Sequence, residues 1–201
     1  MDIKLILKFF VSSLLFLLII SEPVFAHADA ASLKGGFMSG FMHPISGLDH
    51  VVAMVAVGLW GAFLGRPAIW VLPVVFPLVM AFGGALGVAG VPIPHIETGI
   101  ALSGVILGLV VLFAVKPPMW IAAIIVGAFA IFHGHAHGTE LPNAANPLIY
   151  SVGFVIGTGL LHLAGIAIGE LKPLFNGWIV RAGGAVVAII GLGFLTHMIS
   201  A

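Results

Sequence analysis

The chain has 201 residues, of which 61% are hydrophobic and only 7% are charged. Because a soluble domain carries about 25% charged residues, this composition excludes a soluble globular protein and indicates an integral membrane protein. Acidic and basic residues are equal in number, at seven each, and cysteine is absent. The charge balance excludes a basic surface for nucleic acid. The absence of cysteine excludes disulfides and thiolate metal sites.

The first predicted element is a signal peptide at residues 1–26. Lys4 and Lys8 precede a long apolar run, and Pro23 is followed by the small-residue ending "VFA". This layout is typical of a secretory signal peptide, with cleavage after Ala26. The alternative is an uncleaved first membrane helix. Cleavage would leave His27 at the N-terminus, where its α-amine and imidazole together can chelate a metal ion, although a mature chain can also begin with a histidine that binds nothing.

Six further apolar stretches follow, separated by breaks in which prolines cluster. A helix needs about 20 apolar residues to cross about 30 Å of hydrocarbon, and prolines mark the points where helices begin or end. We therefore predict a single domain at residues 27–201, an all-α polytopic membrane fold of six transmembrane helices. The predicted spans are about 37–65, 68–90, 96–115, 119–139, 147–171 and 177–199.

The charged residues predict how these helices are oriented. With the mature N-terminus outside, the first, third and fifth connections are cytoplasmic, and they hold Arg66, Lys116 and Lys172. The outer connections hold three acidic residues and a single lysine. The positive-inside rule thus agrees with the signal peptide. Glycines at four-residue spacing, as in Gly83 and Gly87, predict close helix packing; the sequence leaves the oligomeric state open, a homo-oligomer included.

Nine histidines are present, and the predicted topology gathers most of them in the outer leaflet. In "FHGHAHGTE", His133 and His137 are four residues apart and Glu140 is three further on, so all three share one helix face. A histidine pair at this spacing can bind one divalent ion. His135 points elsewhere, to a supporting position or to the outer mouth. The alternative is a water-exposed helix end with incidental histidines.

A second cluster lies in "HPISGLDH", in the outer half of the first span. His43 and His50 are seven residues apart, about 10 Å on a straight helix, which is too far for them to share an ion. Pro44 and Gly47 predict a kink or an unwound segment between them, which is tolerated in a membrane where the backbone lines a cavity. Asp49 would then supply an oxygen ligand or fix the imidazole tautomer. The alternative is a buried Asp–His pair that only joins helices.

Other candidates are weaker. Glu97 is favoured near a helix N-terminus by the helix dipole alone, and His95 follows a proline in a loop. His162 in the fifth span is more typical of a packed histidine, although it could also act as a relay deeper along a path. Imidazole and carboxylate without sulfur suit nickel, cobalt, zinc or copper(II). The residues alone therefore predict a histidine-rich site for a divalent transition ion that opens outward, and leave the metal open.

At "HPISGLDH" and "FHGHAHGTELP" the chain resembles the HupE/UreJ family, bacterial membrane proteins associated with nickel hydrogenases and ureases. The resemblance covers essentially the whole mature chain. The pattern H-P-x-x-G-x-D-H is matched by His43, Pro44, Gly47, Asp49 and His50, and the pattern F-H-G-x-A-H-G-x-E is matched by Phe132, His133, Gly134, Ala136, His137, Gly138 and Glu140. The first motif is also similar to the H-x-x-x-x-D-H signature of another nickel/cobalt transporter family, with one extra residue here.

This resemblance implies a secondary permease rather than an enzyme. It would take up Ni²⁺ or Co²⁺ from the periplasm across the inner membrane, with no prosthetic group, and would indirectly supply an enzyme such as hydrogenase or urease. The metal-handling residues that it implies are His43, Asp49, His50, His133, His137 and Glu140. The weaker candidates are His27, His95, Glu97, His135 and His162.

Two other functions remain open. An intramembrane zinc hydrolase could use Glu140 as general base, and would keep its metal through purification and cleave a lipid or peptide. A metal sensor or delivery protein would bind the ion without transporting it. The sequence contains no nucleotide-binding loop, so transport is expected to be driven by the membrane potential or by ion coupling.

Overall fold

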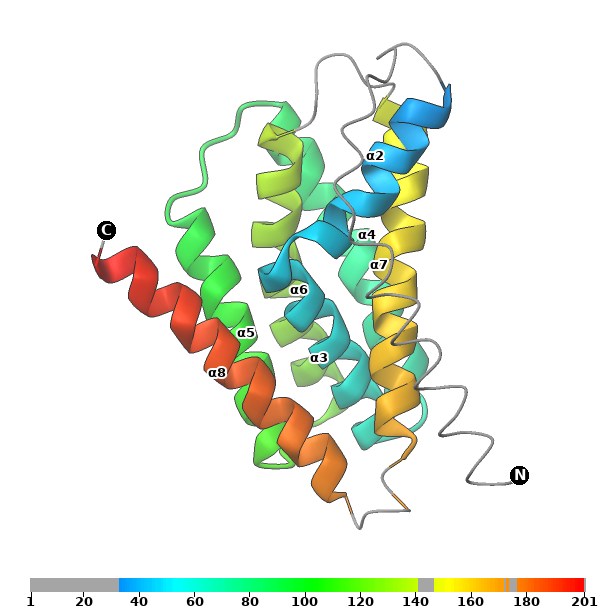
Figure 1. Ribbon diagram of the computed structural model, residues 1–201, viewed down its shortest axis with the longest axis vertical. Helices are drawn as coiled ribbons and strands as arrows, with labels where there is room; N and C mark the ends of the chain where they lie inside the picture. Colours follow the sequence, from blue (N-terminus) through cyan, green and yellow to red (C-terminus); the bar gives the residue numbers. More distant parts are fainter. Residues whose placement is uncertain (1–32, 141–146, 172, 174–176, 201) are drawn as a thin grey trace.

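The computed structural model describes residues 33–140, 147–171, 173 and 177–200. Within these ranges all regular structure is helical, which confirms the predicted all-α class for this part of the chain (Figure 1). The helices are α2 (Leu33–Ser46), α3 (Leu48–Leu64), α4 (Ala68–Val88), α5 (Ile96–Leu112), α6 (Met119–Thr139), α7 (Pro147–Gly169) and α8 (Trp178–Ser200). The predicted signal peptide and His27 lie outside the described residues.

The helices support part of the prediction of six spans. Among the described residues, α4, α6, α7 and α8 are each long and apolar enough to cross a membrane, and α2 with α3 would form a fifth, broken span. Helix α5 has 17 residues, about 25 Å at 1.5 Å per residue, which is shorter than a typical hydrocarbon core. It ends at Leu112 rather than 115, because Ala114 has a positive φ of 55° and Pro117 and Pro118 follow. Six spans therefore stay a prediction.

Helix α3 forms the centre of the bundle and packs against α4, α5, α7 and α8 (Figure 1). Its side chains at Met54, Val57, Leu59 and Trp60 are fully buried. The Trp60 indole N–H donates to the carbonyl of Val115 at 3.1 Å, which ties the turn after α5 to the core. Large apolar side chains cover the outer surface of the bundle, where lipid would contact them; they include Trp70, Leu78, Phe82, Trp120, Ile124 and Ile189.

Glycines let helices α4 and α6 pack backbone against backbone. A Cβ at Gly134 would overlap the carbonyl oxygen of Met80, and a Cβ at Gly138 would overlap that of Gly84. On α4, a Cβ at Gly87 would overlap the carbonyl of His135. The predicted packing role of small residues is confirmed at this contact, which holds the C-terminal half of α6 tightly against α4.

The break between α2 and α3 is the feature that builds the site. Gly47 is extended (φ −91°, ψ 113°), and the two helices meet at 78°. The kink expected between Pro44 and Gly47 is present, and Pro44 itself lies inside α2. Because of this bend, His43 and His50 approach the same region from different directions instead of lying along one helix face.

Candidate metal centre

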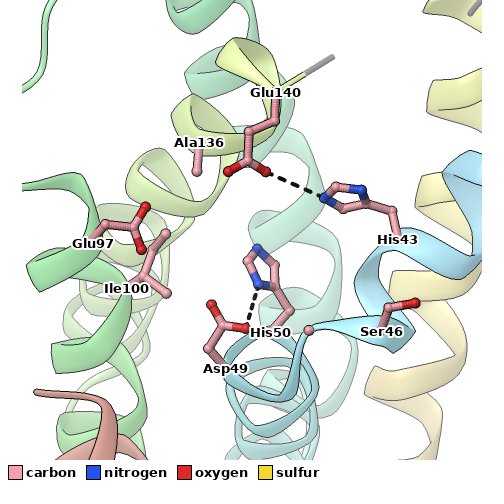
Figure 2. Close-up of a pocket in the computed structure, with 9 residues that line it drawn as sticks. His43, Ser46, Asp49, His50, Glu97, Ile100, Ala136 and Glu140 are labelled. Atoms are coloured by element: carbon pink, nitrogen blue, oxygen red, sulfur yellow. Dashed lines mark ion pairs between the residues drawn. The ribbon is translucent and has the colours of Figure 1, made fainter. Parts of the chain in front are cut away.

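A cavity of about 300 Å³ opens where the ends of four helices meet (Figure 2). The C-terminal ends of α2 and α6 and the N-terminal ends of α3 and α5 surround it. Its lining consists of His43, Ser46, Gly47, Asp49, His50, Glu97, Ile100, Ala136 and Glu140. The side chain of Glu140 is 58% exposed, so the cavity communicates with the outside of the bundle.

The lining of the cavity carries acidic side chains, which would attract a cation. Three of its lining residues, Asp49, Glu97 and Glu140, carry carboxylates, and no lysine or arginine is among the residues described as lining it. Asp49 and Glu97 lie in the first turns of α3 and α5, where the helix dipole favours a negative charge. Glu140 instead caps the C-terminus of α6, where the dipole disfavours one. Its position therefore does not serve the stability of its own helix, whereas a bound cation would compensate its charge.

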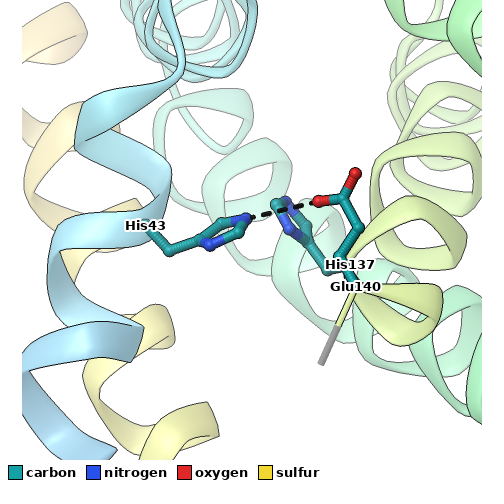
Figure 3. A group of neighbouring side chains, drawn as sticks. All are labelled: His43, His137 and Glu140. Atoms are coloured by element: carbon teal, nitrogen blue, oxygen red, sulfur yellow. Dashed lines mark ion pairs between the residues drawn. The ribbon is translucent and has the colours of Figure 1, made fainter. Parts of the chain in front are cut away.

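Among the described residues, His43, His137 and Glu140 form a close group of potential ligands (Figure 3). One ring nitrogen of each histidine and one carboxylate oxygen lie within 4.8 Å of one another. The His43 Nε2 atom is 3.8 Å from the Glu140 Oε2 atom. Since each ligand atom lies about 2 Å from a shared transition ion, two ligand atoms cannot be more than about 4 Å apart. To hold an ion, the ligand atoms of these three side chains would therefore have to move closer together by less than about 1 Å.

A second group of histidine rings lies directly behind the first and shares His137 with it. The ring centroid of His50 is 4.4 Å from that of His137 and 4.7 Å from that of His133. All three side chains are buried, with His133 fully so. Within the described part of the chain, the His50 Nε2 atom, the His133 Nδ1 atom and both ring nitrogens of His137 have no hydrogen-bond partner. Buried polar atoms are usually paired, so this concentration of free nitrogens indicates a site for a ligand.

Neighbouring groups determine which nitrogen of His50 is free. The Asp49 Oδ1 atom is 3.2 Å from the His50 Nδ1 atom (Figure 2). An acceptor at this nitrogen favours the tautomer with its proton on Nδ1, and leaves the lone pair of Nε2 available. Asp49 thus lies in the position of a residue that orients a metal-binding imidazole.

Ser103 orients the ring of His133 in the same way, and no sequence pattern indicates this role. The Ser103 hydroxyl donates to the carbonyl of Ile100 at 2.6 Å, and its oxygen is 2.9 Å from the His133 Nε2 atom. Because the single hydroxyl proton is already used, Ser103 accepts a hydrogen bond from His133 Nε2–H. This leaves the lone pair on Nδ1, the atom that has no partner among the described residues. A serine in an apolar helix can be recognised as a partner only after the helices are packed.

Replacing Ser103 by alanine is expected to weaken metal binding by about tenfold, the lower end of the effect of such supporting contacts. The His133 ring would then be free to adopt either tautomer and to rotate. Equilibrium dialysis of Ni²⁺ against the purified protein measures the change. Ser103→Thr keeps the hydroxyl and should restore most of the affinity. Equal affinity of Ser103→Ala and wild type would contradict this role.

The remaining sequence candidates lie in other places. His135 is buried on a different side of α6, where its Nε2 atom is 2.7 Å from the Val91 carbonyl oxygen, so it holds the α4–α5 connection and does not lie at the outer mouth. His95 is exposed at the residue before α5, with a φ of 57°. His162 lies deeper, on α7. The structure therefore brings together the six principal candidates and Glu97, whereas their binding of metal stays a prediction.

The comparisons with known proteins agree with the motifs. Residues 15–194 match the model of the HupE / UreJ protein family. The chain is 47% identical over 174 residues to Protein HupE of Rhizobium leguminosarum bv. viciae, covering 86% of this chain and 91% of the relative. No solved structure matches the chain. The fold, the site motifs and this match over most of the chain together show that the protein belongs to the HupE/UreJ family.

Proposed function

We propose that the protein is a secondary permease that takes up Ni²⁺, or Co²⁺, from the periplasm across the bacterial inner membrane. The observation that carries the proposal is the cavity lined by three carboxylates and two histidines, with two further buried histidines behind it. Membership of the HupE/UreJ family supports it, because the family is associated with nickel hydrogenases and ureases. The imported ion would supply such an enzyme, and the protein itself would not be a catalyst.

The donor set fits the proposed cargo. Imidazole nitrogens and carboxylate oxygens suit Ni²⁺ and Co²⁺, and the absence of cysteine from the sequence disfavours soft ions such as copper(I). The ion would first meet His43 and Glu140, of which Glu140 is exposed. It would then pass to His50, His133 and His137, which are buried. His137 contacts the rings of both His43 and His50, so it would hand the ion from one group to the other.

The membrane potential is a sufficient driving force for this transport. A doubly charged ion that moves inward gains about 4.6 kcal/mol per 100 mV, at about 2.3 kcal/mol for each charge. Since 1.4 kcal/mol corresponds to a tenfold ratio, this supports an accumulation of about three orders of magnitude. No resident cofactor is required, because the ion is the substrate.

The proposal is tested by accumulation of radioactive nickel in cells that lack their own nickel importers. Cells expressing the protein should accumulate nickel at nanomolar external metal, and unlabelled Ni²⁺ should compete for this uptake. Stronger competition by Co²⁺ than by unlabelled Ni²⁺ would make cobalt the preferred cargo. Accumulation no greater than in cells with the empty vector, for nickel and cobalt alike, would refute the permease.

A further inference from the structure

Two polar side chains on α7 lie deep in the bundle, away from the cavity. Thr158 and His162 are one helical turn apart, and their exposed fractions are 0% and 1%. As far as the structure describes the chain, the hydroxyl of Thr158 and both ring nitrogens of His162 have no hydrogen-bond partner. Residues four apart share a helix face, so three unpaired polar atoms point into one region of the interior.

This region is distinct from the histidines at and behind the cavity, which we call the outer histidines: His43, His50, His133 and His137. The carbonyl of His162 packs against Gly58 on α3, where a Cβ would overlap it. Gly58 is eight residues beyond His50 along α3, which places this level about 12 Å further along the helix. The Phe76 ring on α4 lies between the two regions, with its centroid 5.6 Å from His133 and 5.6 Å from His162.

Among the described residues, these polar atoms make no hydrogen bond that would stabilise the fold. Buried polar atoms that lack a partner destabilise a protein, and apolar residues would fill the same space without that penalty. Polar side chains inside a membrane bundle typically mark the pathway of a substrate. A neutral imidazole nitrogen and a hydroxyl oxygen can both donate an electron pair, so the two side chains together can coordinate a divalent metal cation.

We propose that Thr158 and His162 form a second, inner station for the transported divalent ion, on the far side of Phe76 from the outer histidines. This inference rests on the proposed permease function. The station offers no carboxylate of its own, since neither residue is acidic, so it would bind the ion more weakly than the outer site. Weak binding at the inner station suits transport, because an ion must be held weakly enough at each successive site to leave it.

A substitution by cysteine tests direct contact with the ion. The wild-type chain has no cysteine, so His162→Cys introduces a single thiol at the station. Addition of Cd²⁺ to this purified variant in lipid nanodiscs should produce the ultraviolet charge-transfer band of a cadmium thiolate. Leu163→Cys is the matched control, since Leu163 is the next residue and faces outward with 52% of its surface exposed. No band in His162→Cys, or an equal band in the control, would overturn the station.

Transport measurements on the variants His162→Leu and Thr158→Val distinguish a role of these residues in ion transport from a role in helix packing alone. We expect the maximal rate of Ni²⁺ uptake into proteoliposomes to fall at least tenfold in His162→Leu and about threefold in Thr158→Val. Ni²⁺ affinity at the outer site should stay within twofold, and the melting temperature should be equal or higher. Wild-type uptake by folded His162→Leu would refute the station alone. An absence of uptake by the wild type would refute the permease, whatever the cadmium band shows.

Discussion

Replacement of His137 by leucine is expected to lower Ni²⁺ uptake at least a hundredfold while the protein stays folded. His137 belongs to both groups of potential ligands, since it lies near Glu140 and His43 on one side and near His50 on the other. Loss of a group that only supports a metal ligand typically lowers affinity by about 10- to 100-fold, and loss of a shared ligand should exceed this. Leucine also removes two buried nitrogens that have no partner among the described residues, so the melting temperature should not fall.

His135 provides the matched control two residues away. Its Nε2 atom is 2.7 Å from the carbonyl oxygen of Val91, and loss of this hydrogen bond should destabilise the protein by about 1 kcal/mol. His135→Leu should therefore melt at a lower temperature and keep the half-saturating Ni²⁺ concentration of the wild type. Uptake assays and thermal melts on the two variants measure this opposite pattern. Normal uptake by His137→Leu would show that the cluster does not bind the ion.

Replacement of Gly134 by alanine is expected to destabilise the protein by about 3 kcal/mol, the upper part of the usual range for overpacking. The added Cβ would overlap the carbonyl oxygen of Met80 and lie 2.9 Å from the backbone nitrogen of Gly84. Neither atom is the end of a flexible side chain, so helices α4 and α6 must move apart. Because Gly134 follows His133 directly, the same movement displaces the buried histidines, and uptake per folded molecule should fall about tenfold or more.

Gly127→Ala is the control on the same helix. The nearest side-chain atoms to a Cβ there belong to Val79 and Val75, at 3.7 and 4.0 Å, which is ordinary van der Waals contact. Alanine is also a better helix former than glycine, so this variant should be neutral or slightly more stable and should transport normally. Denaturation of both purified proteins gives the comparison. Equal stability of Gly134→Ala and Gly127→Ala would mean that α4 and α6 are not packed as described.

The sequence predicted the helices well because apolar length and proline position are local signals. Helix α4 begins directly after Pro67 and α6 directly after Pro118, as the proline-rich breaks indicate. The number of spans does not follow from these local signals, since α5 is short and the first predicted span is broken at Gly47. The bend angle of 78° depends on how α2 packs against α7, which no local pattern encodes.

The sequence motifs name residues that the structure brings close together, but they do not predict which of these residues contact one another. The spacing of His133, His137 and Glu140 suggests one shared face, and the structure shows how its members differ in their partners. Glu140 groups with His43 and His137, and His133 packs against His50 and Ser103. His137 contacts both groups. An i, i+4 pair shares a face only approximately, and the neighbouring helices decide which ring turns to which partner. Contacts between α6 and the elements α2, α3 and α5 are tertiary, which is why Ser103 could not be identified from the sequence.

The most direct test of the account is Ni²⁺ transport by the purified protein alone in proteoliposomes. With an interior-negative potential of about 100 mV, wild-type vesicles should accumulate Ni²⁺ well above the external concentration, given about 4.6 kcal/mol for each ion. Vesicles with His137→Leu should accumulate no more than empty ones. If wild-type vesicles bind Ni²⁺ but accumulate none in their interior under any imposed potential, proton gradient or sodium gradient, the protein is a metal-binding membrane protein and not a permease.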